Sequence, residues 1–219
     1  MTHVPRALFV VAALSALPAT STAQVGPPEA GMVDLVGLSA ESSYALAISA
    51  DGRVIVGYAF PADSNENHAV RWADGTITDL GTLGGARSIA RGISADGTVI
   101  FGNAMLSNGD MRAFRWQSGT MQNLGTLGGN SSFAEGISRD GTAIVGYSFA
   151  DLSFYRAFRW TEGDGMIDLG TLGGDYSMAN AVSGDGAVVV GYSYLAGNST
   201  QRAFRWSGGV MTDLGGGDA

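Results

Sequence analysis

The chain repeats one phrase four times, and this repetition constrains the fold more than any other feature of the sequence. The tryptophans lie 44, 44 and 46 residues apart, at Trp72, Trp116, Trp160 and Trp206. Asp-Gly pairs keep nearly the same period and begin at Asp51, Asp96, Asp140 and Asp185. Two unrelated markers with one period indicate an array of similar units, each of which buries its apolar surface against its neighbours.

Each repeat contains four short segments with the composition of β-strands. In the second repeat these are residues 90–94, 99–103, 112–116 and 121–124, which we call strands a, b, c and d. They are rich in Val, Ile, Phe and Trp and are bounded by Gly, Asp and Ser, as strands are. The four units run over about residues 39–85, 86–129, 130–174 and 175–216.

The links between the strands predict antiparallel hairpins. The Asp-Gly pairs lie between strands a and b, where both residues suit the positive φ angles of a type I′ turn. A serine precedes each Asp by two residues and is expected to bond to the turn backbone. Strands c and d are joined by links of three to five residues that contain glycine. Each unit is therefore predicted to be a four-stranded antiparallel sheet.

The apolar pattern predicts that both faces of each sheet are covered. In strand c of the second unit, Phe114 and Trp116 point to one face and Ala113 to the other, and strand b of the first unit is apolar on both sides. Stacking the units around an axis covers both faces and limits exposed edges. The sequence thus predicts an all-β, propeller-like array of four four-stranded antiparallel units of about 44 residues. The alternative is a parallel β-solenoid with two rungs in each unit.

The two ends of the repeat raise a question of closure. Residues 31–35 match residues 165–169, so an extra d-type strand is predicted before the first unit, while the last unit also ends with a strand d at 210–214. Either a four-bladed ring carries a surplus strand, or the ring is open and a second chain completes it. A homodimer through the open ring edges is one form of the second arrangement.

The first 23 residues have the organisation of a secretory signal peptide. Arg6 precedes an apolar run over residues 7–17, and Ser21-Thr22-Ala23 is a small-x-small cleavage site. No stretch reaches the roughly 20 apolar residues of a membrane-spanning helix. Residues 24–219 are therefore predicted to form a single exported β-repeat domain, extracellular or periplasmic, with no membrane span.

The charge and the cysteine count limit which partners the protein can bind and what can stabilise its fold. The chain has 20 acidic residues, 12 basic residues and a net charge of −8. Nucleic acid and anionic membranes are poor partners for such a chain. Cysteine is absent, so the core alone must hold the fold.

The repeated motifs together resemble the extracellular HAF repeat family, which is named for a His-Ala-Phe triplet. The residues that carry this resemblance are HAVRW at 68–72, RAFRW at 112–116, 156–160 and 202–206, the LGTLGG segments and the IS-x-DG turns. The first copy keeps the His but has Val70 in place of Phe, and the other copies have Arg in place of His. The resemblance implies a bacterial secreted or surface-associated repeat protein, and it supplies no catalytic residue.

Residues that recur in every unit are interpreted as structural. A catalytic residue is needed once and not in every unit. The Asp and Trp residues that recur in all four units are therefore expected to build the fold. Nucleophilic catalysis is disfavoured because cysteine is absent and His68 is the single histidine after the predicted leader. Residues 63–74 have calcium-loop spacing, but His68 stands where glycine is required. Neither a metal nor a cofactor is predicted.

The segments between strands b and c differ in every unit. Because strands alternate in direction, these b–c loops gather on one side of the array. Variable loops on a rigid scaffold suit binding, although loops that merely tolerate change also vary. The candidate binding residues are Asp63, Glu66, His68, Asp110, Asp151, Phe154, Tyr155 and Tyr194.

Two functions remain open from the sequence. One is a non-enzymatic exported module that binds a surface glycan or a protein through the b–c loops. The alternative is a secreted carbohydrate-active enzyme that uses carboxylates in the same loops. A third possibility is that the chain is a fragment of a longer repeat array and has no independent activity.

Overall fold

The computed structural model describes residues 35, 37–38, 42–62, 64–151 and 153–215. The predicted leader, Asp63 and residues 31–34 of the predicted extra strand lie outside this part of the chain. The described residues form sixteen β-strands and no helix.

The strands form four sheets of four strands each. The first contains β1 (Ser43–Ile48), β2 (Val54–Ala59), β3 (His68–Ala73) and β4 (Thr76–Asp79). The second contains β5 (Gly84–Ile93), β6 (Val99–Leu106), β7 (Met111–Gln117) and β8 (Thr120–Asn123). The third contains β9 (Ser132–Ile137), β10 (Ala143–Phe149), β11 (Tyr155–Thr161) and β12 (Gly165–Asp168). The fourth contains β13 (Gly173–Val182), β14 (Val188–Leu195), β15 (Gln201–Ser207) and β16 (Val210–Asp213).

Within each sheet the strands pair in chain order and antiparallel, so strands a to d of one unit make one sheet. The predicted array of four-stranded antiparallel units is confirmed. The solenoid alternative is wrong, because its strands would pair in parallel between successive rungs.

Strand a is longer than predicted in the second and fourth units. β5 and β13 contain ten residues each and begin at the Gly-Gly pairs that the sequence interpretation placed at the end of the preceding unit. A Cβ on Gly85 would lie 2.5 Å from the carbonyl oxygen of Leu106, and one on Gly174 would lie 2.6 Å from that of Leu195. Glycine is needed here because the end of strand b approaches the start of strand a so closely.

The a–b hairpins form, but their turns are not type I′. Only the glycine of each Asp-Gly pair has a positive φ, which is +75° at Gly52. Gly52 N donates to Ser49 O at 3.0 Å, while Ser49 Oγ accepts from Val54 N at 3.0 Å and donates to Asp51 Oδ1 at 2.6 Å. The serine side chain thus replaces a backbone acceptor and closes a loop longer than two residues. The same bonds recur in the other three units.

Positive φ at both central residues occurs instead in the c–d turns. Asp74 and Gly75 have φ of +51° and +72° and form the two-residue link between β3 and β4. The Ser118-Gly119 and Gly208-Gly209 pairs also have two positive φ angles. These short hairpins have the type I′ character that the sequence interpretation assigned to the a–b turns.

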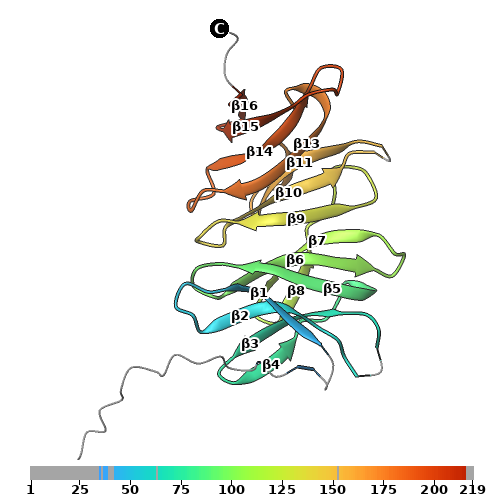
Figure 1. The fold of residues 1–219 in the computed structure, drawn as a ribbon, viewed down its shortest axis with the longest axis vertical. Coiled ribbons are helices and arrows are strands. Elements are labelled where there is room, and N and C mark those ends of the chain that lie inside the picture. The colour runs from blue at the N-terminus through green and yellow to red at the C-terminus, as the bar shows by residue number, and fades with distance from the viewer. Residues whose placement is uncertain (1–34, 36, 39–41, 63, 152, 216–219) are drawn as a thin grey trace, which may run out of the picture. The chain divides into compact units, whose positions relative to one another are not determined.

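The four sheets stack face to face in chain order (Figure 1). We call one face of each sheet the leading face. It carries the Trp of strand c and the Phe or Val two residues before that Trp. In the second to fourth sheets it packs on the preceding sheet, around Phe114, Phe158 and Phe204. The opposite, trailing face carries the strand c Ala and a Val or Phe of strand b. These trailing residues are Val56 and Ala69, Phe101 and Ala113, Val145 and Ala157, and Val190 and Ala203.

A buried serine joins the sheets at each of these three interfaces. Ser88 Oγ of β5 accepts from Ala69 N of the preceding sheet at 2.8 Å and donates to Gly81 O at 2.6 Å. Ser132 and Ser177 make the same two bonds at the second and third interfaces. Each interface thus combines an apolar cluster with one fully satisfied buried hydroxyl, which fixes the register between sheets.

Candidate binding site

The b–c loops and the a–b turns lie on opposite sides of the stack (Figure 1). This is the arrangement that the alternating strand directions predict. Of the candidate binding residues, all but Asp63 are described. They do not form one site but fall into three groups.

The first group, Glu66 and His68, lies in the first unit. Glu66 is exposed. His68 Nδ1 is 2.8 Å from Asp79 Oδ2, at the end of strand d. In the third unit, Arg156 Nη1 lies 3.7 Å from Asp168 Oδ2 at the corresponding place. In the first and third units, the residue before the strand c alanine therefore ties strand c to the end of strand d, which is a structural contact.

The second group, Asp110 and Asp151, lines one cavity between the second and third units. The cavity has a volume of about 450 Å³ and is also lined by Arg112, Gly129 and Asn130. Arg112 Nη2 is 3.8 Å from Asp110 Oδ2. Two carboxylates from different b–c loops therefore face one space beside a guanidinium.

The carboxylate of Asp151 is held by the backbone of its own loop. Its Oδ1 accepts from Ser153 N at 2.7 Å and from Phe154 N at 2.9 Å. These bonds, with Ser153 first, lower the pKa of Asp151 below its ordinary value. Asp151 is therefore ionised at neutral pH and suited to accept hydrogen bonds from a ligand rather than to donate a proton.

The third group, Phe154, Tyr155 and Tyr194, meets around Tyr176 at the interface of the third and fourth units. The ring centroid of Tyr176 lies 5.7 Å from Phe154, 4.9 Å from Tyr155 and 5.5 Å from Tyr194. Tyr147, Phe149 and Tyr192 extend the group through further ring contacts. We call these seven residues the aromatic cluster. They come from two sheets and from the loops at their b–c ends.

The hydroxyl groups of the aromatic cluster lie in a partly desolvated environment. The hydroxyl oxygens of Tyr155 and Tyr192 are 3.5 Å apart. Burial, followed by this contact, raises the pKa of Tyr155 above its ordinary value, and burial also raises the pKa of Tyr147. Both side chains are therefore neutral at physiological pH and offer ring faces and hydroxyl groups, not charge.

Polar side chains border the aromatic cluster. Asp175 N donates to Asn198 Oδ1 at 2.8 Å, and the Asn198 amide donates to Asp175 in return. Gln201 Nε2 donates to Tyr194 OH at 2.6 Å. The aromatic cluster therefore combines half-buried rings with amides and carboxylates that are held by hydrogen bonds.

The sequence interpretation did not include Tyr176, the centre of the aromatic cluster. It lies near the start of β13, at a position occupied by Arg87 and Ser131 in the two preceding units. The variation that pointed to the b–c loops is therefore also present here. Tyr147 and Tyr192 lie within strand b, at the position of Tyr58 in the first unit.

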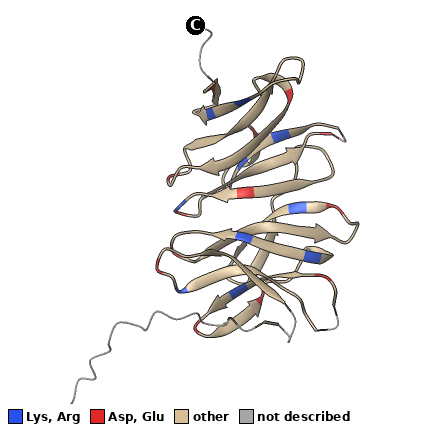
Figure 2. Cartoon of the chain, in the orientation of Figure 1, with Lys and Arg blue, Asp and Glu red and all other residues tan. Residues whose placement is uncertain are grey.

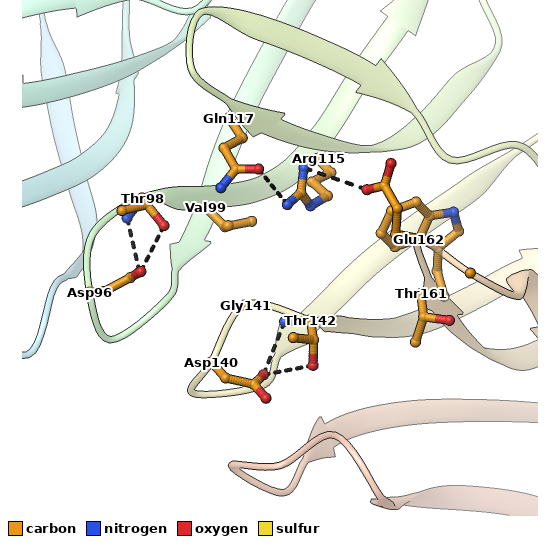
Figure 3. Close-up of a pocket in the computed structure, with 12 residues that line it drawn as sticks. Asp96, Thr98, Val99, Arg115, Gln117, Asp140, Gly141, Thr142, Thr161 and Glu162 are labelled. Carbon is orange, nitrogen blue, oxygen red and sulfur yellow. Dashed lines mark hydrogen bonds and ion pairs between the residues drawn. The ribbon is translucent and has the colours of Figure 1, made fainter.

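A second cavity lies on the side of the a–b turns, between the second and third units (Figure 3). Its volume is about 450 Å³. Arg115 Nη2 donates to Gln117 Oε1 at 2.7 Å, and its Nη1 is 4.0 Å from Glu162. Trp160 lines the cavity but is only 4% exposed. This cavity therefore offers mainly polar groups that already bind one another.

Asp96 and Asp140 at this second cavity serve their own turns. Asp140 Oδ1 accepts from Ser138 Oγ at 2.6 Å and from Thr142 N at 3.0 Å. These bonds, with the serine hydroxyl first, lower the pKa of Asp140, and the equivalent bonds lower that of Asp96. Both carboxylates thus have a structural task, as the sequence interpretation expected of repeated acids.

The charged residues show no concentration of one sign. In Figure 2, arginines and acidic residues are scattered over all four sheets. Within the described part of the chain, no group of three or more His, Cys, Asp or Glu side chains is placed to hold a metal ion. Nor do those residues contain any helix long and apolar enough to span a membrane.

The fold resembles those of several solved structures. TolB from Acinetobacter baumannii is 18% identical with a TM-score of 0.55, over 80% of this chain and 43% of that one. Putative TolB from Agrobacterium tumefaciens is 15% identical with a TM-score of 0.54, over 82% and 64%. A prolyl endopeptidase structure is 14% identical with a TM-score of 0.59, over 87% and 32%.

These neighbours contain β-propellers. The chain has a propeller-like β-repeat fold. At such low identity the likeness concerns the fold alone, and the chain spans less than two thirds of the length of each neighbour. No protein-family model matches the sequence, and no curated protein matches it.

Proposed function

We propose that the chain is an exported, non-enzymatic binding module of the HAF repeat type. Its partner binds the b–c side of the third and fourth units. The observation that supports this is the aromatic cluster around Tyr176, which joins side chains of two units at positions where the repeat varies.

The chemistry of this surface suits a partner with both apolar and hydroxyl-bearing groups. Tyrosines supply a large contact area at low conformational entropy cost. Asp151, Asp175 and Asn198 lie beside them and add directional hydrogen bonds. A surface glycan fits this combination, and so does a protein patch of mixed polarity.

The test is retention of the purified protein on insoluble polysaccharides and, separately, on bacterial envelope preparations. Tyr176→Ala is expected to reduce retention about tenfold or more, because stacked aromatic side chains at the centre of a contact commonly account for much of its affinity. Tyr44→Ala is the matched control, since Tyr44 is an exposed tyrosine of the first sheet.

The two matrices distinguish a glycan from a protein partner. Retention on polysaccharide supports a glycan, whereas retention on envelope that protease treatment of the matrix abolishes supports a protein. Failure to bind either matrix, or equal binding by the Tyr176→Ala and Tyr44→Ala variants, contradicts the proposed site.

A carbohydrate-active enzyme is the second candidate, because Asp110 and Asp151 line one cavity. It predicts that the purified protein releases sugar from a polysaccharide. It also predicts that Asp110→Asn and Asp151→Asn each abolish this release while thermal unfolding stays unchanged. Sugar release that survives both substitutions would exclude this pair as the catalytic carboxylates.

A further inference from the structure

The trailing face of the fourth sheet is exposed where its three counterparts are buried. Val190 is 39% exposed, whereas the equivalent side chains are at most 4% exposed. Ala203 is exposed and its equivalents are fully buried. Leu214 is 54% exposed and its equivalents are at most 7% exposed. The equivalents are Val56, Phe101 and Val145, then Ala69, Ala113 and Ala157, then Leu80, Leu124 and Leu169.

The leading face of the first sheet is also incomplete. Ile48 is 57% exposed. Ala45 is exposed, whereas the equivalent alanines of the other three sheets, Ala90, Ala134 and Ala179, are fully buried. Within the described residues, no sheet covers Ala45 and Ile48.

The first sheet nevertheless carries a pair of leucines like those that lie in the interfaces between sheets. Leu35 and Leu38 pack against Val70 and Trp72 on the leading face. They correspond in sequence to Leu169 and Leu172, which lie in the apolar cluster between the third and fourth sheets. Each of the four leading faces therefore has its own leucine pair.

The two uncovered faces are the two halves of an interface that the chain builds three times. Ser43 occupies the position of Ser88, the buried serine of the first interface, and Ala203 occupies the position of its backbone donor Ala69. The apolar surfaces, the leucine pair and the serine are thus divided between the fourth and the first sheet. These sheets lie at opposite ends of the stack (Figure 1).

We infer that the trailing face of the fourth sheet binds the leading face of the first sheet in a second copy of the chain. Ala203 N donates to Ser43 Oγ of that copy, and Val190 packs beside its Ala45 and Ile48. Leu214 then lies at this interface as Leu80 does at the first, since Leu214 N donates to Ala203 O as Leu80 N donates to Ala69 O. This self-association goes beyond the proposed function, and the residues altered in its test lie outside the aromatic cluster.

The geometry points to a closed pair. A contact between two different faces is heterologous, so it continues until the copies close a ring or form a filament. Two copies supply eight units, which is within the usual propeller range of about four to eight. Each copy then contributes one trailing and one leading face, and two identical interfaces close the ring.

The test is sedimentation of the purified protein over a wide range of concentrations. We expect a dimer, and we expect Val190→Glu to weaken it about a hundredfold or more, because a carboxylate would be buried without a partner. Val210→Glu is the matched control. Val210 lies in the same sheet and is 63% exposed. The equivalent residues Thr76 and Thr120 are exposed even though another sheet packs against the trailing face of their own sheet.

A second variant tests the head-to-tail arrangement. Ile48→Glu alters the other face and is also expected to be monomeric. A mixture of the Val190→Glu and Ile48→Glu proteins retains one intact pair of faces, so mixed dimers are expected to form, more weakly than in the unaltered protein. Both side chains are exposed, and unchanged thermal unfolding of the variants verifies that they fold.

Three results would overturn the inference. A monomer at every concentration shows that the faces do not meet in a second copy. A dimer that survives Val190→Glu or Ile48→Glu uses different surfaces. Assemblies that grow beyond two copies exclude the closed ring.

Discussion

The two sides of the stack use the repeat in opposite ways. On the side of the a–b turns, every unit has the same serine and aspartate with the same hydrogen bonds, as in Ser138 and Asp140. On the b–c side, no two loops are alike, and ring contacts join the third and fourth units through Tyr176. Repeated positions therefore stabilise the array, whereas the positions that break the repeat are available for binding.

The largest expected effect contrasts a repeated phenylalanine with an unrepeated one. Phe158 is fully buried between the second and third sheets, so Phe158→Ala should cost about 3–5 kcal/mol in the free energy of unfolding. Phe154 lies in a b–c loop, and Phe154→Ala should cost less than about 1 kcal/mol. Urea unfolding of both variants measures the difference. Equal costs would contradict the distinction between repeated and unrepeated positions.

A smaller effect is expected from the serine of the a–b turn. Ser138 Oγ accepts from Ala143 N at 2.9 Å and donates to Asp140. Ser138→Ala leaves that buried N–H without its acceptor and should cost about 1–3 kcal/mol. Ser153→Ala, at an exposed loop position, is the control and should change the stability by less than about 0.5 kcal/mol. Thermal unfolding of the two variants checks this ordering.

The turn aspartates should make stability depend on pH in the acid range. The pKa of Asp140 in the folded protein is lowered from its ordinary value of 3.8. Its contribution is therefore complete above that value and is lost as the pH falls through the lower folded pKa, because the unfolded chain takes up the proton first. Asp140→Asn should flatten the fall of the urea midpoint below about pH 4. An unchanged acid slope in this variant would contradict the assignment.

The smallest effect is expected from an ion pair between neighbouring sheets. Arg91 Nη2 of β5 lies 2.7 Å from Glu135 Oε2 of β9. The arginine side chain is 44% exposed, so a double-mutant cycle with Arg91→Ala and Glu135→Ala should give a coupling of about 0.2–1 kcal/mol. A coupling well above this range would mean that unrepeated contacts also stabilise the array, which would weaken the distinction between the two sides.

Sequence reasoning placed the candidate residues on the correct side but did not group them. Asp110 and Asp151 share a cavity because the second and third sheets stack, and Tyr155 meets Tyr194 through Tyr176 because the third and fourth sheets stack. The strands that carry these residues are far apart in the chain. Their proximity follows from the distance and angle between sheets, which no local pattern encodes.

The sequence by itself determined the period, the four antiparallel strands of each unit and the two apolar faces. These properties depend on neighbouring residues, on alternation along a strand and on turn chemistry, all of which are local. Only the tertiary structure decided the turn type at Ser49 and Asp51, the direction in which Phe158 packs, and the exposure of Val190. These depend on side chains that reach across a loop or onto another sheet, and such contacts exist only once the units have stacked.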